Sequence, residues 1–226
     1  MVSQRPIAAA QLQVLLDTRN VLIKRMILSS MVGMMETIIL ASVSPRRKEL
    51  LAKIGLKFKV EPSNYEEELN SGLEPHALAK ALSLKKAELV AKNHRNALVI
   101  AADTFAVFEG QILGKPKTET DARKMLETIS GRQHSVITGF TIIDTGSNKV
   151  LSRSVATIVY IRELISNEID AYVRTKEPLD KAGAYAIQGL GSVIVEKIEG
   201  DYFNVVGLPL SALAEALKEF GVKILK

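Results

Sequence analysis

Apolar and polar residues follow one another along the chain in blocks that predict strands and helices in alternation. The apolar run Ile38–Ala41 predicts a strand. Ser44 is a favoured capping residue and Pro45 suits the first helical position, so a helix is expected to begin at Pro45. That helix should end at Ile54, because Gly55 follows it. The chain therefore turns directly from a buried strand into a helix.

Further blocks predict elements of both kinds. Ala97–Ala102 is apolar throughout, which is typical of a central strand buried on both faces. Hairpin turns are expected at Glu109–Gly110, at Thr145–Asn148 and at Glu199–Asp201. The same periodicities predict strands at Phe58–Val60, Phe105–Phe108, Gln111–Leu113, Ser135–Asp144 and Val150–Ile161, and helices at His76–Lys92, Thr120–Ile129, Asn167–Arg174 and Leu210–Phe220. Helices interleaved with a mixed sheet predict an α/β fold, and the separation of the long hairpins from the early strand–helix units suggests two lobes.

The composition fits a folded domain. At 226 residues and 47% hydrophobic content, the chain is long enough for one domain, or two lobes, with a substantial core. The lack of cysteine excludes disulfides and thiolate zinc sites. The formal charge is +5, but four cations and one acid precede Glu36, which leaves about +2 for the remainder. That charge is too small for a duplex-binding surface, so we expect no nucleic-acid partner.

The first 35 residues differ from the rest. No apolar run in the sequence reaches the roughly 18 residues of a membrane-spanning helix, and the nearest candidate, Met26–Met35, is too short. We therefore expect no membrane segment. Three interpretations of residues 1–35 stay open: an extension read from an early start codon, with Met34 or Met35 as the functional start; a basic, acid-poor targeting peptide; or an added helix.

The corner between the first strand and helix is a candidate anion site. Such a corner presents free backbone N–H groups and the positive end of a helix dipole. Arg46 and Arg47 fall in the first helical turn, where cations are unfavourable unless an external anion offsets them. The alternative is an ordinary solvated basic face.

A carboxylate follows the predicted central strand. Asp103 comes directly after Ala102, where α/β sheets gather their ligands, and it suits a metal ligand or a general base. The alternative is an aspartate that caps the next turn. The acidic run Glu66–Glu68 could supply a second metal carboxylate, or could simply be solvated. The histidines show no metal-ligand spacing and are read as structural or exposed: His76, His94 and His134.

Lysines and a glutamine complete the candidates. Ammonium groups suit phosphate oxygens, although each lysine taken singly is more typical of a surface. The lysines are Lys86, Lys115 and Lys181. Gln188 can offer a donor and an acceptor together to a base edge, and Gly189 and Gly191 beside it would let a ligand approach the backbone.

Taken together, these segments resemble the Maf family of nucleoside triphosphate pyrophosphatases. The resemblance is carried, in this order, by Leu40–Leu51, Ala101–Thr104, Leu113–Pro116, Ser130–His134, Glu177–Gly189 and Asn204–Leu210. It runs from about Ile38 to the C-terminus. It implies an N-terminal extension of unknown role over residues 1–35, and a Maf-like nucleotide pyrophosphatase domain over 36–226 with an elongated, two-lobed mixed-sheet fold like that of inosine triphosphate pyrophosphatases (Maf/Ham1).

The resemblance also implies an activity. Such enzymes are cytoplasmic, metal-dependent hydrolases that cleave a nucleoside triphosphate between the α and β phosphates, releasing the monophosphate and pyrophosphate and cleaning the nucleotide pool. The family suggests a homodimer. The alternative hypothesis is a nucleotide-binding regulator of septum formation and cell division with little hydrolysis.

Roles carry over residue by residue. Asp103 is expected to accept a proton and, with Glu67, to hold Mg²⁺ or Mn²⁺, although the family usually has Asp-Glu where this chain has Glu66-Glu67. The triphosphate is expected to contact Ser42, Arg46, Arg47, Lys86 and Lys115.

Three positions favour one branch of the family. Members that act on dTTP and UTP carry Arg, Thr and Gln where this chain has Arg46, Thr104 and Gln188. The branch that acts on 7-methylguanosine triphosphate has an aromatic residue, Gln and Glu there. An amide can pair with the uracil edge, which has both acceptors and a donor. The sequence therefore favours dTTP and UTP, and it does not rank modified pyrimidine triphosphates beside them.

Overall fold

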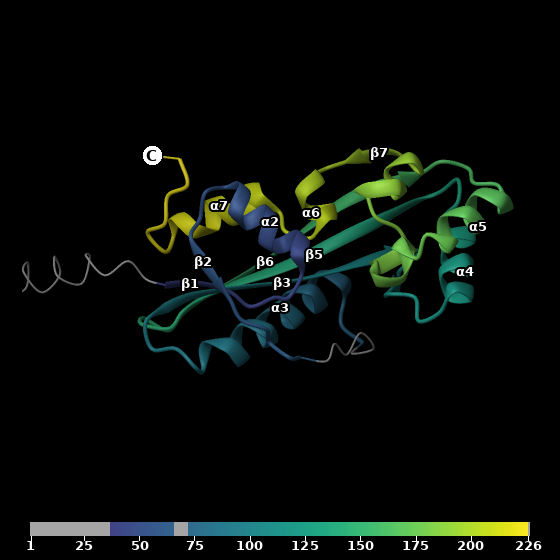
Figure 1. Cartoon of the computed structure of the whole chain (residues 1–226). Coiled ribbons are helices and arrows are strands. Elements are labelled where there is room, and N and C mark those ends of the chain that lie inside the picture. The colour runs from purple at the N-terminus through teal and green to yellow at the C-terminus, as the bar shows by residue number, and fades with distance from the viewer. Residues whose placement is uncertain (1–36, 66–71, 226) are drawn as a thin grey trace, which may run out of the picture. The chain divides into compact units, whose positions relative to one another are not determined.

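A computed structural model describes residues 37–65 and 72–225, and within them the strands form one mixed seven-stranded sheet (Figure 1). The strands are β1 (Thr37–Leu40), β2 (Phe58–Val60), β3 (Ala97–Phe108), β4 (Gln111–Leu113), β5 (Gln133–Asp144), β6 (Lys149–Ile161) and β7 (Val195–Glu199). The helices are α2 (Pro45–Lys53), α3 (Pro75–Ala91), α4 (Glu119–Ile129), α5 (Ser166–Arg174), α6 (Tyr202–Val206) and α7 (Leu210–Lys218). The predicted elements up to α5, and the final helix, are confirmed to within a few residues, except that the strands predicted at Ala97–Ala102 and Phe105–Phe108 form the single strand β3. The interpretations of residues 1–35 lie outside the described part of the chain.

The strand order is β2-β1-β3-β5-β6-β7, and the short β4 pairs with β3. The pairs β1–β2 and β1–β3 are parallel, whereas the remaining pairs are antiparallel. This arrangement confirms the α/β class with a mixed sheet. Among the described helices, none is long and apolar enough to cross a membrane.

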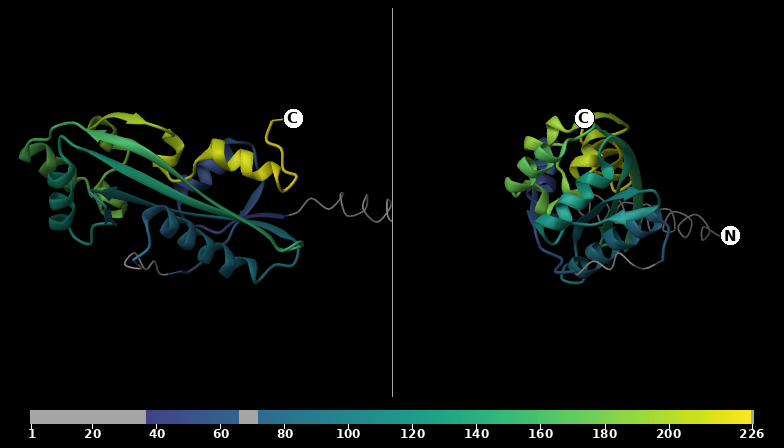
Figure 2. Two further views of the ribbon diagram at one scale, coloured as in Figure 1. Left: turned by 180° about the vertical axis from the view of Figure 1, so that it is seen from behind. Right: turned by 90° about the vertical axis from the view of Figure 1, so that its right-hand side faces the viewer.

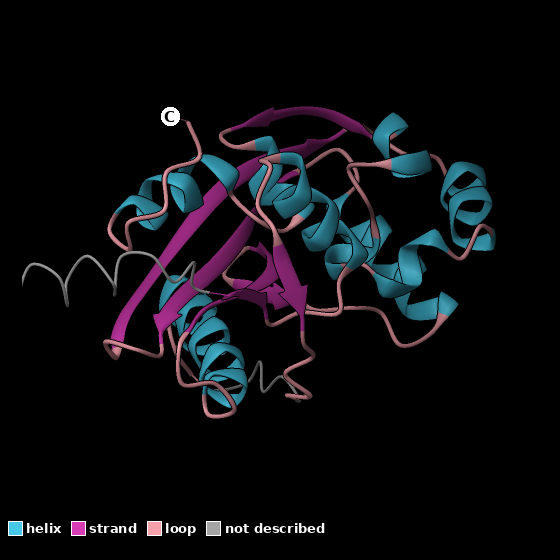
Figure 3. Cartoon of the chain, turned by 60° about the vertical axis from the view of Figure 1, so that its left-hand side comes forward, coloured by secondary structure: helices cyan, strands magenta, loops and turns pink. Residues whose placement is uncertain are grey.

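Helices cover both faces of the sheet (Figures 1 and 3). α3 lies on one face, while α2, α6 and α7 lie on the other, and the view from behind shows the same layering (Figure 2). Because strand side chains alternate between faces, Leu98 and Ile100 pack with α2 and α7, whereas Val99 and Ala101 pack with α3. The prediction of a central strand buried on both faces is therefore confirmed.

The two largest of the four core clusters in the described residues lie toward opposite ends of the long β5–β6 hairpin. One packs β1, β3, α2 and α7 together. The other packs α4 and α5 against the far halves of β5 and β6, through residues that include Leu126, Ile129, Val159 and Ile169. This division agrees with the expected two lobes, which share a single sheet.

One prediction about β3 is wrong. The strand does not end at Ala102 but continues to Phe108, so Asp103 and Thr104 lie inside it. The reason is the pairing of β3 with β5. This pairing includes every β3 residue from Leu98 to Val107, so the backbone stays extended at Asp103 and Thr104.

The opposite edge of β3 has a gap. β1 pairs with β3 only as far as Ile100, and β4 begins to pair at Ala106. Among the described residues, no strand covers the edge of β3 between these two points. The side chains of Asp103 and Thr104 therefore lie next to an open section of the sheet.

The last predicted hairpin is also wrong. After β7 the chain enters helix α6, because the carboxylate of Asp201 accepts hydrogen bonds from the N–H groups of Phe203 (2.8 Å) and Asn204 (3.3 Å). β7 instead pairs with β6. The chain leaves α6 at Gly207, whose φ of +124° favours glycine. This turn brings the end of α6 toward the gap beside β3.

Candidate active site

A cavity of about 430 Å³ lies beside the open section of β3. It is lined by every predicted site residue that the structure describes: Ser42, Arg46, Arg47, Lys86, Asp103, Thr104, Lys115 and Gln188. These residues come from α2 and the corner before it, from α3, from β3, from the chain after β4 and from the loop before β7. Glu67, the expected second metal carboxylate, lies outside the described residues, so its role stays a prediction.

The β1–α2 corner forms one wall of this cavity. Ser44 caps α2, since its Oγ accepts a hydrogen bond from the N–H of Arg47 at 3.5 Å, and Pro45 begins the helix as expected. Ser42 Oγ accepts from the N–H of Ser44 at 3.3 Å and from Arg47 Nη1 at 3.3 Å. Lys48, the third cation of the corner, is exposed to solvent. The cavity therefore faces the positive end of a capped helix.

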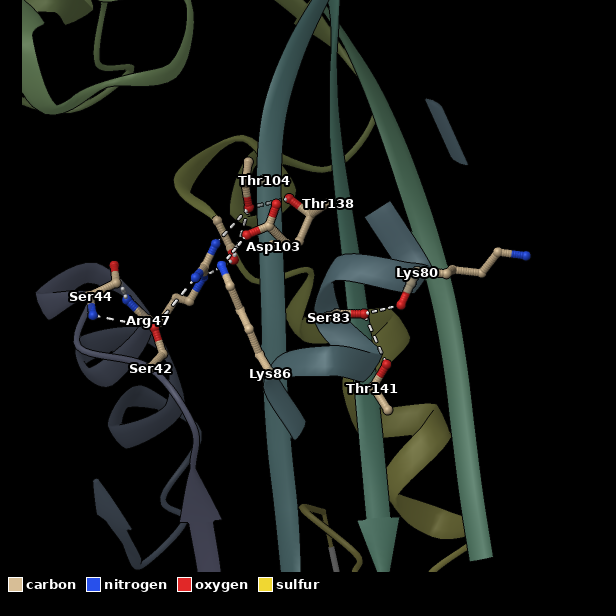
Figure 4. A network of polar contacts seen from close by, with 11 residues as sticks. Ser42, Ser44, Arg47, Lys80, Ser83, Lys86, Asp103, Thr104, Thr138 and Thr141 are labelled. Carbon is tan, nitrogen blue, oxygen red and sulfur yellow. Dashed lines mark hydrogen bonds and ion pairs between the residues drawn. The ribbon is translucent and has the colours of Figure 1, made fainter. Parts of the chain in front are cut away.

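Arg47 connects three elements around the cavity (Figure 4). Its Nη2 donates a hydrogen bond to Thr104 Oγ1 at 3.1 Å, and its Nε donates to the carbonyl of Gly207 at 3.0 Å. Thr104 in turn shares a hydrogen bond with Thr138 of β5 at 2.9 Å, and Thr138 donates to the carbonyl of Asn204 at 2.9 Å. Gly207 was not predicted as a site residue, although it lies in a segment that carried the family resemblance.

Asp103 meets a cation from the opposite face of the sheet. Its side chain leaves β3 on the side of α3, where Lys86 Nζ donates a hydrogen bond to Asp103 Oδ1 (Figure 4). Lys86 is 6% exposed and Asp103 is 2% exposed. Removing either partner of such a buried pair is destabilising, because it leaves an uncompensated charge in the interior.

Packing of α3 on β5 fixes where Lys86 lies. Gly139 is the partner of Asp103 in the β3–β5 register. A Cβ atom at Gly139 would overlap the backbone carbonyl of Ala79 in α3 and would lie 2.7 Å from the backbone nitrogen of Lys80. The helix therefore approaches the sheet closely because this position is glycine.

A carboxylate that the sequence analysis did not single out also lines the cavity. Asp180 forms an ion pair with Lys181, which was a candidate phosphate ligand and likewise lines the cavity. Partial burial raises the pKa of Asp180, but the hydrogen bond from Lys181 and the charges of Lys181 and Arg46 outweigh it and hold that pKa below its usual value. Asp180 thus contributes a negative charge close to Arg46 and Lys181.

Neither of the paired glycines lines the cavity, and the approach of a ligand to their backbone stays a prediction. A Cβ atom at Gly189 would lie 2.7 Å from Glu177 Oε2, and one at Gly191 would overlap the carbonyl of Ala186 and the hydroxyl of Tyr172. The space beside these glycines is thus occupied by the protein. Neither Glu177 nor Tyr172 was predicted as a functional residue.

The histidine predictions agree with the structure. His134 is buried, and its Nε2 shares a hydrogen bond with the hydroxyl of Tyr185 at 2.9 Å. Burial lowers the pKa of His134 to about 4, so the ring is neutral at neutral pH. Burial raises the pKa of Tyr185, which lines the cavity. Over residues 37–65 and 72–225, no group of three His, Cys, Asp or Glu side chains is arranged to hold a metal ion.

Over most of its length the chain is similar to one protein family and to named members of known function. A family model described as Maf-like protein matches residues 37–220. The dTTP/UTP pyrophosphatase of Methanosarcina barkeri is 52% identical over 191 residues, which are 84% of this chain and 97% of that protein. The dTTP/UTP pyrophosphatase of Dictyoglomus turgidum is 49% identical over 193 residues, which are 85% of this chain and 100% of that protein. The Ham1 protein of Staphylococcus aureus aligns with 71% of this chain and 80% of its own, with a TM-score of 0.44 and 14% identity.

Proposed function

The chain belongs to the Maf family, and on this basis we propose that it hydrolyses dTTP and UTP to the nucleoside monophosphate and pyrophosphate. The observation that carries the proposal is that cations, one buried carboxylate and the three residues expected to select the base line a single cavity. The names of the relatives at about half identity support the same substrates.

The cationic side of the cavity suits a triphosphate. The N-terminus of α2 offers backbone N–H groups, and Arg46 and Lys115 add positive charge beside them. Charge builds up on the pyrophosphate as it leaves, and fixed cations stabilise that charge more than they stabilise the bound substrate. In the proposed reaction these groups bind the phosphates and lower the barrier to cleavage.

Asp103 is the proposed proton acceptor. It would take a proton from the water that attacks the phosphoanhydride between the α and β phosphates, while the bridging oxygen leaves with the pyrophosphate. Lys86 holds the Asp103 carboxylate in one orientation through their ion pair. Lys86 also lines the cavity, and we propose that it contacts phosphate oxygens as well.

A divalent cation shared with the substrate is part of this proposal. Mg²⁺ is usually held by one or two carboxylates together with phosphate and water oxygens, so a single buried carboxylate beside a triphosphate is a suitable donor set. We propose that Asp103 and Glu67 hold Mg²⁺ or Mn²⁺. The bound cation would supply positive charge to the phosphate oxygens.

Base selection is proposed for Gln188, Thr104 and Arg46, the last of which is also one of the cations assigned to the triphosphate. The amide of Gln188 can donate to and accept from the uracil edge, and Arg46 and Thr104 complete the pattern of the dTTP and UTP branch. The Thr104 hydroxyl is fixed by Arg47 and Thr138. A homodimer and a cytoplasmic location follow from the family membership as further proposals.

The Asp103→Asn variant tests the proposed proton acceptor. We expect kcat for pyrophosphate release from dTTP, with Mg²⁺ present, to fall by about 100-fold or more, because the amide cannot accept a proton. The matched control is Asp170→Asn on α5, outside the cavity, which should keep the activity. Activity of Asp103→Asn within a few-fold of the wild type would contradict the assignment. A wild-type protein that binds dTTP but releases no pyrophosphate with Mg²⁺, Mn²⁺ or Co²⁺ would favour the regulator hypothesis.

A further inference from the structure

Two donor groups of Arg47 are directed toward the short helix α6. Its Nε donates a hydrogen bond at 3.0 Å to the carbonyl of Gly207, the residue directly after the helix. Its Nη2 donates to Thr104 Oγ1 at 3.1 Å, and Thr104 is linked through Thr138 to the carbonyl of Asn204 in the helix (Figure 4). A guanidinium is planar and its donors have fixed directions, so these two bonds set the orientation of the whole group.

The direction of the hydroxyl chain follows from its last acceptor. A carbonyl has no proton to give, so Thr138 is the donor in its 2.9 Å bond to Asn204. Each hydroxyl has a single proton, and the 2.9 Å bond between Thr104 and Thr138 is therefore donated by Thr104. The Gly207 carbonyl, at 3.4 Å from Thr104 Oγ1, belongs to the same segment. Both routes from Arg47 thus end on backbone carbonyls of α6 or of the residue after it.

The side chain of Asn204 holds α6 on two strands of the sheet. Its Nδ2 donates to the carbonyl of Val136 in β5 at 2.9 Å and to Thr157 Oγ1 in β6 at 3.0 Å. Thr157 also accepts from the N–H of Asp201 at 3.0 Å and donates to the Asp201 carbonyl at 3.0 Å. Because Asp201 caps α6, the helix is bound to the sheet both at its start and at its middle.

These partners require an amide at position 204. The Val136 carbonyl is an acceptor, and Thr157 has already used its proton on Asp201, so both groups need an N–H from Asn204. Asn204 is 0% exposed and does not line the cavity, whereas Val205, Val206 and Gly207 do. The residue therefore fixes this part of the cavity wall from behind.

We propose that Asn204 is a positioning residue: it holds α6 on β5 and β6, and the carbonyls of Asn204 and Gly207 then orient the Arg47 guanidinium for phosphate oxygens. This inference rests on the proposed function, because that function assigns Arg47 to the triphosphate. Asn204 contacts no substrate in this scheme and acts through Arg47.

Two uncharged variants test it. Asn204→Ala removes the amide, and Thr157→Val keeps the shape of the side chain but removes the hydroxyl that binds Asn204 and Asp201. Titration calorimetry with pyrophosphate and Mg²⁺ measures phosphate binding without hydrolysis. We expect Kd to rise about tenfold in Asn204→Ala, which corresponds to the loss of one hydrogen bond to a charged group, and about threefold in Thr157→Val. Thr157→Ser keeps the hydroxyl and should stay within about twofold of the wild type.

Two comparisons separate positioning from a general loss of stability. Ile129→Val removes one methylene group from the core beside α4 and α5, so it should lower the stability and leave Kd unchanged. Arg47→Ala should weaken pyrophosphate binding by itself. In that background Thr157→Val should change Kd less than twofold, because its effect passes through Arg47.

Several outcomes would overturn the proposal. One is an unchanged Kd in Thr157→Val and in folded Asn204→Ala; if Asn204→Ala does not fold, Thr157→Val decides alone. Another is an effect of Thr157→Val that is as large with Arg47→Ala as without it. A third is equal weakening in Ile129→Val, because Kd would then follow stability alone. A wild-type protein that binds no pyrophosphate also contradicts the proposal. By contrast, a wild-type protein that binds pyrophosphate but releases none from dTTP contradicts the proposed function, and the binding measurements still decide the role of Asn204.

Discussion

Two consecutive residues of β3, Asp103 and Thr104, contact side chains from different helices. The side chain of Asp103 meets Lys86 of α3, while that of Thr104 meets Arg47 of α2, because neighbouring strand residues point to opposite faces. Both line one cavity, since the edge of the strand beside them is open. In the proposed reaction, one residue accepts the proton and its neighbour takes part in selecting the base.

His134 should make the stability of the protein depend on pH. Burial holds its pKa at about 4, against an ordinary value of 6.5. Between these two values the unfolded chain binds more protons than the folded one, so the free energy of unfolding should fall as pH drops from 6.5 toward 4. The loss from His134 between pH 7 and pH 5 is about 2 kcal/mol. Denaturant unfolding at both pH values measures it.

His134→Gln is the comparison for that measurement. The amide does not titrate in this range and keeps a polar group beside Tyr185. The variant should therefore lose about 2 kcal/mol less than the wild type between pH 7 and pH 5. Equal losses in the two proteins would show that the buried imidazole is not the source of the pH dependence.

Among the elements, α3 is placed by its contact with β5. Ser83 of α3 shares a hydrogen bond with Thr141 of β5 at 2.8 Å (Figure 4). Gly139 allows the two backbones to approach. Because Lys86 extends from the same helix to Asp103, the position of α3 determines the ion pair in the cavity. The contact between the helix and the strand is thus part of the site.

Gly139→Ala tests this link. The added methyl group overlaps the backbone of α3, so we expect the variant to be less stable by about 2 kcal/mol or more in urea unfolding, with a lower kcat for pyrophosphate release. The control is Gly146→Ala in the β5–β6 turn, where the nearest atoms are the ends of two side chains at 3.2 and 3.3 Å. Similar stability and kcat in Gly139→Ala and the wild type would mean that α3 can shift without moving Lys86.

The helices and strands could be predicted from the sequence more accurately than the points at which one element ends and the next begins. The start of α2 could be predicted because its signals, Ser44 and Pro45, are local. The continuation of β3 through Asp103 could not, because it depends on pairing with β5, which lies more than thirty residues along the chain. The short helix α6 was missed because Asp201 is a turn residue and also a helix cap, and the neighbouring pattern favoured the turn.

For the whole molecule, the sequence pattern identified candidate residues but did not show that they line one cavity. Lys115 and Gln188 are separated from the β1–α2 corner by long stretches of chain, and only the resemblance to the Maf family indicated that they would share a cavity. The contacts of Glu177 were missed for a different reason. Its carboxylate lies beside Gly189 and accepts hydrogen bonds from the N–H groups of Leu190 and Gly191, and a pair of glycines in a sequence does not reveal whether a ligand or the protein fills the space beside them.

The proposed substrates also concern the whole molecule, because base choice combines residues from α2, β3 and the loop before β7. Pyrophosphate release with Mg²⁺ should be measured on the full chain and on protein that starts at Met35, with dTTP, UTP and 7-methylguanosine triphosphate. We expect kcat/KM to be at least about tenfold higher for dTTP and UTP, and equal in the two proteins. A higher kcat/KM for 7-methylguanosine triphosphate, or no pyrophosphate from any of the three, would contradict the proposed function.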